Sequence, residues 1–394
     1  MMRGEEDMSG SGSSASGTRR ARRRRRLSPV PAAAIALVAV AIAAGAATAI
    51  ALPRMADANT TPTPAATPPA STPTPTPTPL TAAEQLLAGS DDANACALTF
   101  ALDGTAVDPL LVTQGHLYGT LPIPRRDGAV FAGWYATAAD AAGYTTPARI
   151  NGADLASCTD RQQTVYGAWK TPDEVAAEDT AVPILMYHQF TADPAGEDGW
   201  LRLNYAYIGD FTAHMDHIAT GGFYLPTWEE LSAFIDGALF LPARSVIITD
   251  DDADATWLAM AAPVVQQRGL LATSFVITKF RTEPTPNPYV LQRSHTHDMH
   301  EAGADGRGRI VNWSPADIAA DLETSAQILG AKEVLAYPFG HYSDTAKEGV
   351  RLAGFELART IEHGYVRPGT DKLALPCIRI DYGTTVDDLR QLIG

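Results

Sequence analysis

The stretch Ser245-Val-Ile-Ile-Thr-Asp-Asp-Asp-Ala-Asp254 places three adjacent carboxylates directly after an apolar run. The run Val246–Ile248 is typical of a buried strand in a parallel sheet, and α/β enzymes place their chemistry where such strands end. Adjacent carboxylates repel one another and cost stability unless a cation, a proton or solvent compensates for their charge. We therefore expect Asp250, Asp251 and Asp252 to lie at a functional rim of a parallel sheet.

A second unusual stretch, Leu291–His300, follows some forty residues later and holds three histidines, His295, His297 and His300. A single histidine is more often an ordinary core or surface side chain, but three within six residues favour a metal site. Two neutral imidazoles and one carboxylate form a ligand set that suits Zn²⁺ and leaves positions open for water and substrate. Together the two stretches predict a catalytic kind of metal site.

Strand and helix signals alternate from Val182 to the end of the chain. Thr227–Glu230 forms a capping box, and Ser314-Pro315 provides an N-cap followed by proline at the first helical position. Such alternation predicts a parallel sheet or barrel of the α/β class. The expected strands are 184–186, 245–249, 272–277 and 334–337, and the expected helices include 208–218, 255–267, 345–353 and 385–393.

With these residues identified, five segments in the same order resemble the polysaccharide deacetylases of the NodB homology group, carbohydrate esterase family four. The segments are Pro-Ile-Leu-Met-Tyr-His at 183–188, Thr-Asp-Asp-Asp at 249–252, Ala-Thr-Ser-Phe-Val at 272–276, the histidine stretch at 294–300 and Tyr-Pro-Phe-Gly at 337–340. The resemblance implies a distorted (β/α) barrel of the NodB type over residues 171–394. It also implies hydrolysis of N-acetyl groups in an extracellular amino-sugar polysaccharide.

By position, the resemblance implies that Asp252, His295 and His300 bind one divalent metal, which we expect to be zinc. Asp251 is then the general base, which takes a proton from the attacking water. The backbone N–H of Phe339 matches the position that stabilises the oxyanion.

Further residues are expected beside the site in supporting roles. Asp298 either accepts the free N–H of a ligand histidine or forms a turn, and both readings stay open. The supporting residues are His188, His297, Asp298, Tyr337 and Pro338.

Several positions depart from the pattern of the resembling family. Position 250 is apolar in most relatives, and Ala253 stands where they have glycine, which usually marks a backbone that needs positive φ. No arginine precedes Tyr337 to orient the base, and 373–394 holds no histidine to act as general acid, so His363 is the late candidate. Asp250 and Ala253 leave open a catalytically inactive carbohydrate-binding relative. An O-acetyl polysaccharide esterase is a second alternative.

The N-terminal part predicts passage across a membrane. Residues 1–27 read as a disordered basic cytoplasmic tail, and 28–53 as a transmembrane anchor or a signal, since Val30–Leu52 holds no charge and follows an arginine run. Residues 54–93 are a Thr/Pro-rich linker that favours extended polyproline II. We expect the remainder outside the cell, anchored at the cell membrane through Val30–Leu52, or secreted if the segment is cleaved at a site such as Ala49-Ile50-Ala51.

Residues 94–170 predict a small β-rich domain. Strand signals at 97–100, 114–118, 130–135 and 164–169 end in aromatic residues, and the segment resembles the β-grasp-like Listeria–Bacteroides repeats of bacterial surface proteins. We expect an adhesive or spacer module. Cys96 and Cys158 form either a disulfide or two independent buried thiols.

The charge distribution limits the partners. The chain has a net charge of −15, and Met1–Arg54 holds nine arginines against three acids, which leaves −21 on the remainder. Such acidity argues against nucleic acid as a partner. The expected partners are an acetylated polysaccharide substrate and the membrane, and the sequence does not indicate an oligomeric state.

Overall fold

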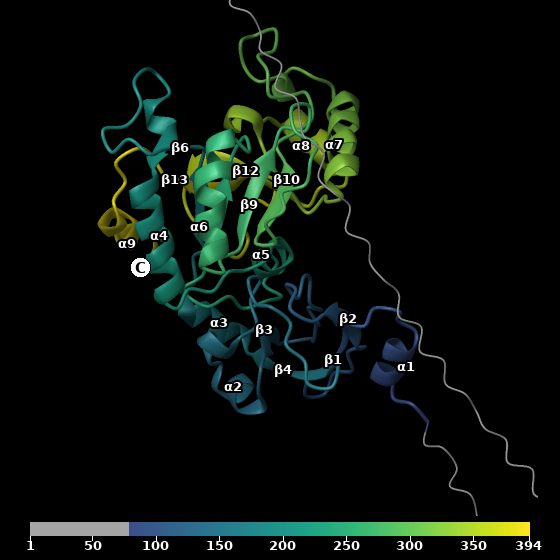
Figure 1. Ribbon diagram of the computed structural model, residues 1–394. Helices are drawn as coiled ribbons and strands as arrows, with labels where there is room; N and C mark the ends of the chain where they lie inside the picture. Colours follow the sequence, from purple (N-terminus) through teal and green to yellow (C-terminus); the bar gives the residue numbers. More distant parts are fainter. Residues whose placement is uncertain (1–78) are drawn as a thin grey trace, which may run out of the picture. The chain divides into compact units, whose positions relative to one another are not determined.

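The computed structural model describes residues 79–394 (Figure 1). These residues form a short N-terminal helix, a four-stranded sheet and a seven-stranded barrel surrounded by helices. The predicted cytoplasmic tail, the span Val30–Leu52 and most of the Thr/Pro-rich linker lie outside the described residues. Within 79–394 no helix combines the length and the apolar character needed to cross a bilayer.

The small sheet has the strand order β2-β1-β4-β3, in which β1 and β4 are parallel and the outer pairs are antiparallel. Three of its strands follow the sequence prediction. The predicted strand 114–118 is wrong, because the chain turns at Gly115, which has a φ of 77°, and His116 N–H bonds back to the Thr113 carbonyl. The elements are α1 Ala82–Ala88, β1 Ala95–Ala101, β2 Leu110–Thr113, β3 Val130–Tyr135, α2 Ala138–Gly143, β4 Gln162–Lys170 and α3 Pro172–Glu178, with a 3₁₀ turn η1 at Thr146–Ala148.

A disulfide joins Cys96 to Cys158 within this part of the chain. It ties β1 to the segment that precedes β4, across 62 residues of sequence. The sequence was compatible with either a disulfide or two separate thiols, and the structure contains the disulfide. The resemblance to a β-grasp-like repeat stays a prediction.

Seven parallel strands close into a barrel in the order β10-β11-β12-β13-β5-β8-β9. The predicted α/β class is thereby confirmed. Strands β12 and β13 were not predicted, and the expected helix 255–267 divides into a π-helical segment η3 and the short α6, which has proline in its first turn. The strands are β5 Ile184–Tyr187, β8 Ile247–Asp250, β9 Ala272–Val276, β10 Val290–Ser294, β11 Val334–Ala336, β12 Leu357–His363 and β13 Leu375–Arg379, with a separate pair β6 Gln189–Thr191 and β7 Tyr205–Tyr207.

The helices around the barrel begin where the sequence places their caps. Thr227 and Glu230 form the expected capping box of α5, and the Ser314 hydroxyl accepts the N–H of Asp317 at the start of α7. The helical segments are α4 Ile208–Thr220, α5 Trp228–Ile235, η3 Trp257–Ala261, α6 Ala262–Gln267, α7 Pro315–Leu329, α8 Asp344–Leu352 and α9 Val386–Ile393, with 3₁₀ turns η2 Arg202–Asn204, η4 Arg309–Val311 and η5 Pro338–Gly340.

Strand β5 shows why a barrel strand with two buried faces is apolar along its length. Ile184 and Met186 belong to the hydrophobic cluster that gathers buried residues from every barrel strand except β10, whereas Leu185 and Tyr187 belong to the cluster beneath α4, α6 and α9. Successive side chains point to opposite faces of a strand, so a strand with both faces buried needs a continuous apolar run.

The small sheet and the barrel share one hydrophobic core. Phe131 of β3 exchanges backbone hydrogen bonds with the segment after α5, donating to Ala238 O and accepting from Phe240 N–H. The fully buried Arg149 crosses this junction: its Nη1 donates to Phe240 O at 2.7 Å and its Nη2 lies 3.6 Å from Glu230 Oε1. A Cβ at Gly133 would collide with the same guanidinium. The small sheet is therefore packed as part of the barrel's own core.

We predict that Glu230→Gln lowers the free energy of unfolding by about 3 kcal/mol, because it leaves the buried Arg149 charge without a counter-charge. Denaturant unfolding of the full chain measures this as a lower midpoint. Glu348→Gln, which removes one partner of an exposed pair with Arg351, serves as control and should change stability by less than about 0.5 kcal/mol. Equal stability of the two variants would contradict the role of Arg149 at the junction.

Candidate metal and catalytic site

The site lies at the carboxyl ends of β8, β10 and β11. Because parallel barrel strands end at one rim, side chains that directly follow different strands meet there. Asp251 still bonds through its N–H to Tyr187 O at 2.9 Å, and the chain then leaves the strand direction. Asp252 and Ala253 both have positive φ, 73° and 51°. The alanine thus occupies the kind of backbone position at which the resembling family has glycine.

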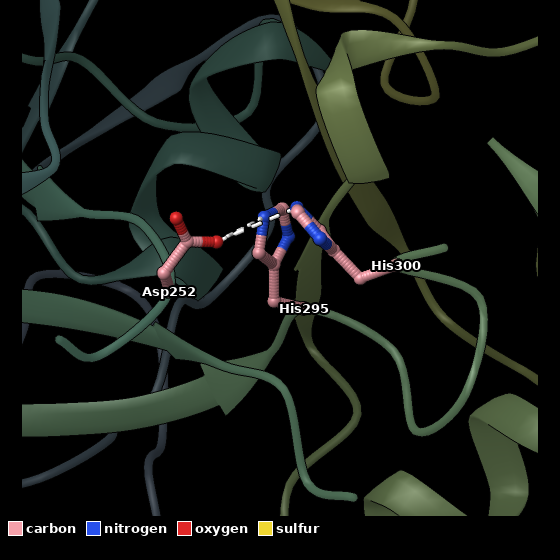
Figure 2. A group of neighbouring side chains, drawn as sticks. All are labelled: Asp252, His295 and His300. Atoms are coloured by element: carbon pink, nitrogen blue, oxygen red, sulfur yellow. Dashed lines mark ion pairs between the residues drawn. The ribbon is translucent and has the colours of Figure 1, made fainter. Parts of the chain in front are cut away.

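The three predicted metal ligands come together. One ligand atom from each of Asp252, His295 and His300 lies within 4.8 Å of the others. Asp252 Oδ1 is 3.5 Å from His295 Nε2 and 3.4 Å from His300 Nε2, and Figure 2 shows the three side chains pointing toward one another. The two histidines are five residues apart, and an irregular loop rather than a helix presents them.

The protonation of these groups suits a metal. His295 Nδ1 is hydrogen-bonded to Ala336 O at 2.9 Å, so this nitrogen carries the proton and the lone pair of Nε2 faces Asp252. Burial lowers the pKa of His295 to about 4. The pKa of His300 is also lowered to about 4, mainly by burial and to a smaller extent by the charge of His295. Both imidazoles are therefore neutral at pH 7, the state in which they bind metals.

Asp252 Oδ1 is a buried acceptor that has no hydrogen-bond donor among the described residues. An oxygen buried without a donor is costly, and a cation held between it and the two imidazoles would remove that cost. The two nitrogens and one oxygen fit a divalent metal such as zinc with open coordination positions.

Asp251 lies beside this triad in an ion pair that the sequence analysis missed. Its carboxylate contacts the fully buried guanidinium of Arg359 in β12, and its Oδ2 is 3.8 Å from His188 Nε2. Burial alone would raise the pKa of Asp251, but the charge of Arg359, with smaller effects of His295 and His188, lowers it to about 2. Asp251 is thus an ionised carboxylate held in a fixed orientation.

Asp250 points to a different environment from Asp251. Its Oδ2 accepts the Ser274 hydroxyl at 3.3 Å, and its side chain is fully buried. Burial, together with the charges of Asp251 and Asp252, raises the pKa of Asp250 well above its ordinary value. The protonated form is thereby favoured, and the repulsion expected among three adjacent carboxylates is reduced.

The loop between the two histidine ligands does not use Asp298 as the sequence suggested. Asp298 pairs with Lys279 and Arg309 at the surface, and its hydrogen bond from Lys279 lowers its pKa. Asp298 does not orient His295, because the Ala336 carbonyl does so instead. His297 Nδ1 lies 3.2 Å from the Thr278 hydroxyl and contacts neither Asp252 nor Asp251.

The segment Tyr337–Gly340 closes one side of the site. The Phe339 backbone is left-handed, with φ 57° and ψ 12°, and its ring lies 4.2 Å from the ring of His300, measured between centroids. Tyr337 is buried and its hydroxyl donates to Leu373 O, and Pro338 is buried as well. Phe339 is the member of this segment that borders the site.

His363 is not brought to the site. Its exposed ring packs against Tyr365, with 6.4 Å between centroids, and among the described residues it contacts none of the triad or Asp251. His188 is instead a histidine next to Asp251, and burial lowers the pKa of His188. The signal for Arg359 was present in the sequence: an arginine inside the apolar run Leu357–Thr360 must be paired if that run is a buried strand.

Comparison with known families matches residues 241–358 to the family described as polysaccharide deacetylase. The resemblance drawn from the five motifs is thereby confirmed for these residues.

Among curated proteins, the chain is similar to poly-beta-1,6-N-acetyl-D-glucosamine N-deacetylase of Staphylococcus aureus strain MRSA252, with 28% identity over 160 residues that cover 35% of this chain and 55% of that protein. The Staphylococcus epidermidis protein of the same name is 26% identical over the same coverage. The chain therefore spans about half the length of the curated relatives it matches.

Among solved structures, the deacetylase PplD of Streptococcus pyogenes in complex with acetate aligns with a TM-score of 0.47 and 21% identity, covering 55% of this chain and 99% of that one. IcaB from Ammonifex degensii aligns with a TM-score of 0.46 and 21% identity, covering 54% of this chain and 96% of that one.

We predict that Arg359→Met lowers the free energy of unfolding by about 3–5 kcal/mol, because it leaves the buried Asp251 carboxylate without its partner. Chemical denaturation at pH 7 measures the loss. Arg351→Met on the exposed face of α8 is the control and should stay within about 0.5 kcal/mol of the wild type. Wild-type stability of Arg359→Met would show that the ion pair contributes nothing to the fold.

Proposed function

We propose that the chain is a metal-dependent enzyme that hydrolyses N-acetyl groups of an amino-sugar polysaccharide of the cell wall or of an exopolysaccharide. The observation that carries this proposal is the triad of Asp252, His295 and His300 beside the oriented carboxylate of Asp251. The names of the similar staphylococcal proteins support an N-acetylglucosamine polymer as the substrate. Zinc is the metal that the two imidazoles and one carboxylate fit best.

In this proposal each polar group beside the metal ligands has one task. Asp252, His295 and His300 would hold a divalent cation, which would polarise the acetyl carbonyl and make the attacking water more acidic. Asp251, held by Arg359, accepts the proton of that water. Because the pKa of Asp251 is low, it can accept this proton only from a water that is more acidic than bulk water. The Phe339 N–H stabilises the developing oxyanion. His188, 3.8 Å from Asp251, carries the proton onward to the leaving amine nitrogen.

The rim around the site offers surfaces for a sugar polymer. Two exposed phenylalanines follow the carboxyl ends of barrel strands, Phe280 after β9 and Phe339 after β11. Aromatic rings present a flat apolar face, which can pack on the apolar face of a pyranose ring. Their position at the rim supports a polymer rather than a small free acetate ester.

Two alternatives to the N-deacetylase are distinguished by an assay of acetate release. An inactive carbohydrate-binding relative would need a disrupted site, yet Asp250 lies apart from the ligands and Ala253 adopts the backbone conformation required there. An O-acetyl polysaccharide esterase would use the same residues on an ester. Acetate release from N-acetylated and from O-acetylated glycans, with chelator and with added Zn²⁺, separates the three possibilities.

We predict that Asp251→Asn keeps the metal but lowers acetate release by about 10²–10⁴-fold, because the amide cannot accept a proton. His295→Ala and Asp252→Asn should lose stoichiometric metal, measured by elemental analysis of the purified full chain. Asp250→Asn should retain at least about a tenth of the activity, which corresponds to about 1.4 kcal/mol of barrier. Loss of metal in Asp251→Asn together with an inactive Asp250→Asn would shift the assignment by one residue.

We also propose that the folded part lies outside the cell, attached to the cell membrane through Val30–Leu52. The Cys96–Cys158 bridge supports this location, because disulfides persist in oxidising compartments. Protease added to intact cells should degrade the folded part, whereas a cytoplasmic control protein stays intact. Full protection of residues 79–394 in that experiment would reverse the assignment.

A further inference from the structure

The loop from Thr296 to Met299, which joins the two histidine ligands, is held from behind by helix α7. Asp321 of α7 accepts two backbone hydrogen bonds from this loop, from His297 N–H at 2.8 Å and from Asp298 N–H at 2.7 Å. Each carboxylate oxygen takes one of them. Asp321 is buried, with 7% of its surface exposed, so solvent competes little for these bonds.

A second contact from the same helix face holds the beginning of the loop. The Ser325 hydroxyl is 2.8 Å from the Ser294 hydroxyl, whose oxygen in turn accepts Thr296 N–H at 3.0 Å. Residues four apart lie on one face of a helix, so Asp321 and Ser325 act side by side. Asp321 accepts the N–H groups of His297 and Asp298, and Ser325 contacts the Ser294 hydroxyl that accepts Thr296 N–H.

The loop needs such support because its backbone includes a strained conformation that its own residues do not stabilise. Thr296 has a φ of 70°, a conformation that a β-branched residue adopts only when its surroundings impose it. Neither ligand is carried by a helix, and the outer contacts of Asp298 with Lys279 and Arg309 are partly exposed and screened by solvent. The buried contacts to α7 therefore fix where His295 and His300 point.

We propose that Asp321 is a positioning residue of the metal site: its carboxylate holds the loop so that the Nε2 atoms of His295 and His300 both face Asp252. This inference rests on the metal site of the proposed function and not on the identity of the substrate. Asp321 does not itself reach the metal, since both its oxygens are engaged with the loop backbone.

The test measures metal binding by the metal-free full-length protein. Competition with a chromophoric chelator gives the Kd for Zn²⁺, and Co²⁺ in its place gives a visible spectrum that reports ligand geometry. Asp321→Ala should raise the Kd for Zn²⁺ about 10–100-fold, the usual effect of losing the support of a metal ligand. Asp321→Asn, whose amide oxygen can still accept one N–H, should raise it less and so rescue part of the loss.

The matched control is Glu323→Gln on the same helix, which removes an exposed partner of Lys332 and should leave the Kd and the Co²⁺ spectrum unchanged. A role in folding alone would lower the melting temperature of Asp321→Ala while its Kd and Co²⁺ spectrum stay those of the wild type, and this would overturn the proposal. If Asp321→Ala does not fold, Asp321→Asn decides by the same two readouts. Wild-type protein that binds Zn²⁺ but releases no acetate from any glycan would refute the proposed activity and leave the role of Asp321 standing, whereas wild-type protein that binds no metal would refute both.

Discussion

The ion pair between Asp251 and Arg359 is the constraint on which the site depends. Both side chains are almost completely buried, and the two residues are 108 positions apart in the sequence. Two charges removed from water are tolerated only when each is matched closely by the other. The register between β8 and β5 and between β12 and β13 must therefore place the guanidinium beside the carboxylate. The same register determines the level along the barrel axis at which Asp252 follows the end of β8.

The candidate metal site follows from the way three strands end. At β8 the chain turns through two left-handed residues, which separates the carboxylate of Asp252 from that of Asp251. At β10 the loop after Ser294 is bonded to α7, and at β11 the Ala336 carbonyl fixes the tautomer of His295. The loop that carries the two histidines is thus held by elements other than its own strand, which explains how an irregular loop can have a defined geometry.

The opposite end of the molecule shows a different use of buried charge. Arg149 belongs to the small sheet, but its partners, Phe240 and Glu230, belong to the barrel, and the hydrophobic cluster continues from one to the other. An arginine that crosses a junction in this way makes separation of the two parts costly, because each would expose apolar surface and one would retain an unpaired charge. A spacer that moves independently of the barrel would not share a hydrophobic core and a buried charge with it.

Some of these features are local and could be predicted from the sequence. The apolar run ending in aspartates, the histidine-rich loop, the capping residues of α5 and α7 and the alternation of strands and helices each depend on neighbouring residues, so the α/β class and the three candidate ligands were accessible. Strands β12 and β13, the partner of Asp251, the pairing of Cys96 with Cys158 and the support of the ligand loop by Asp321 were not. These depend on which distant segments the closed barrel and the small sheet bring together. The spacing of residues in the sequence does not show which distant residues come into contact, because those contacts depend on which strands pair. Once the strands have paired, burial requires each buried charge to have a partner of opposite charge.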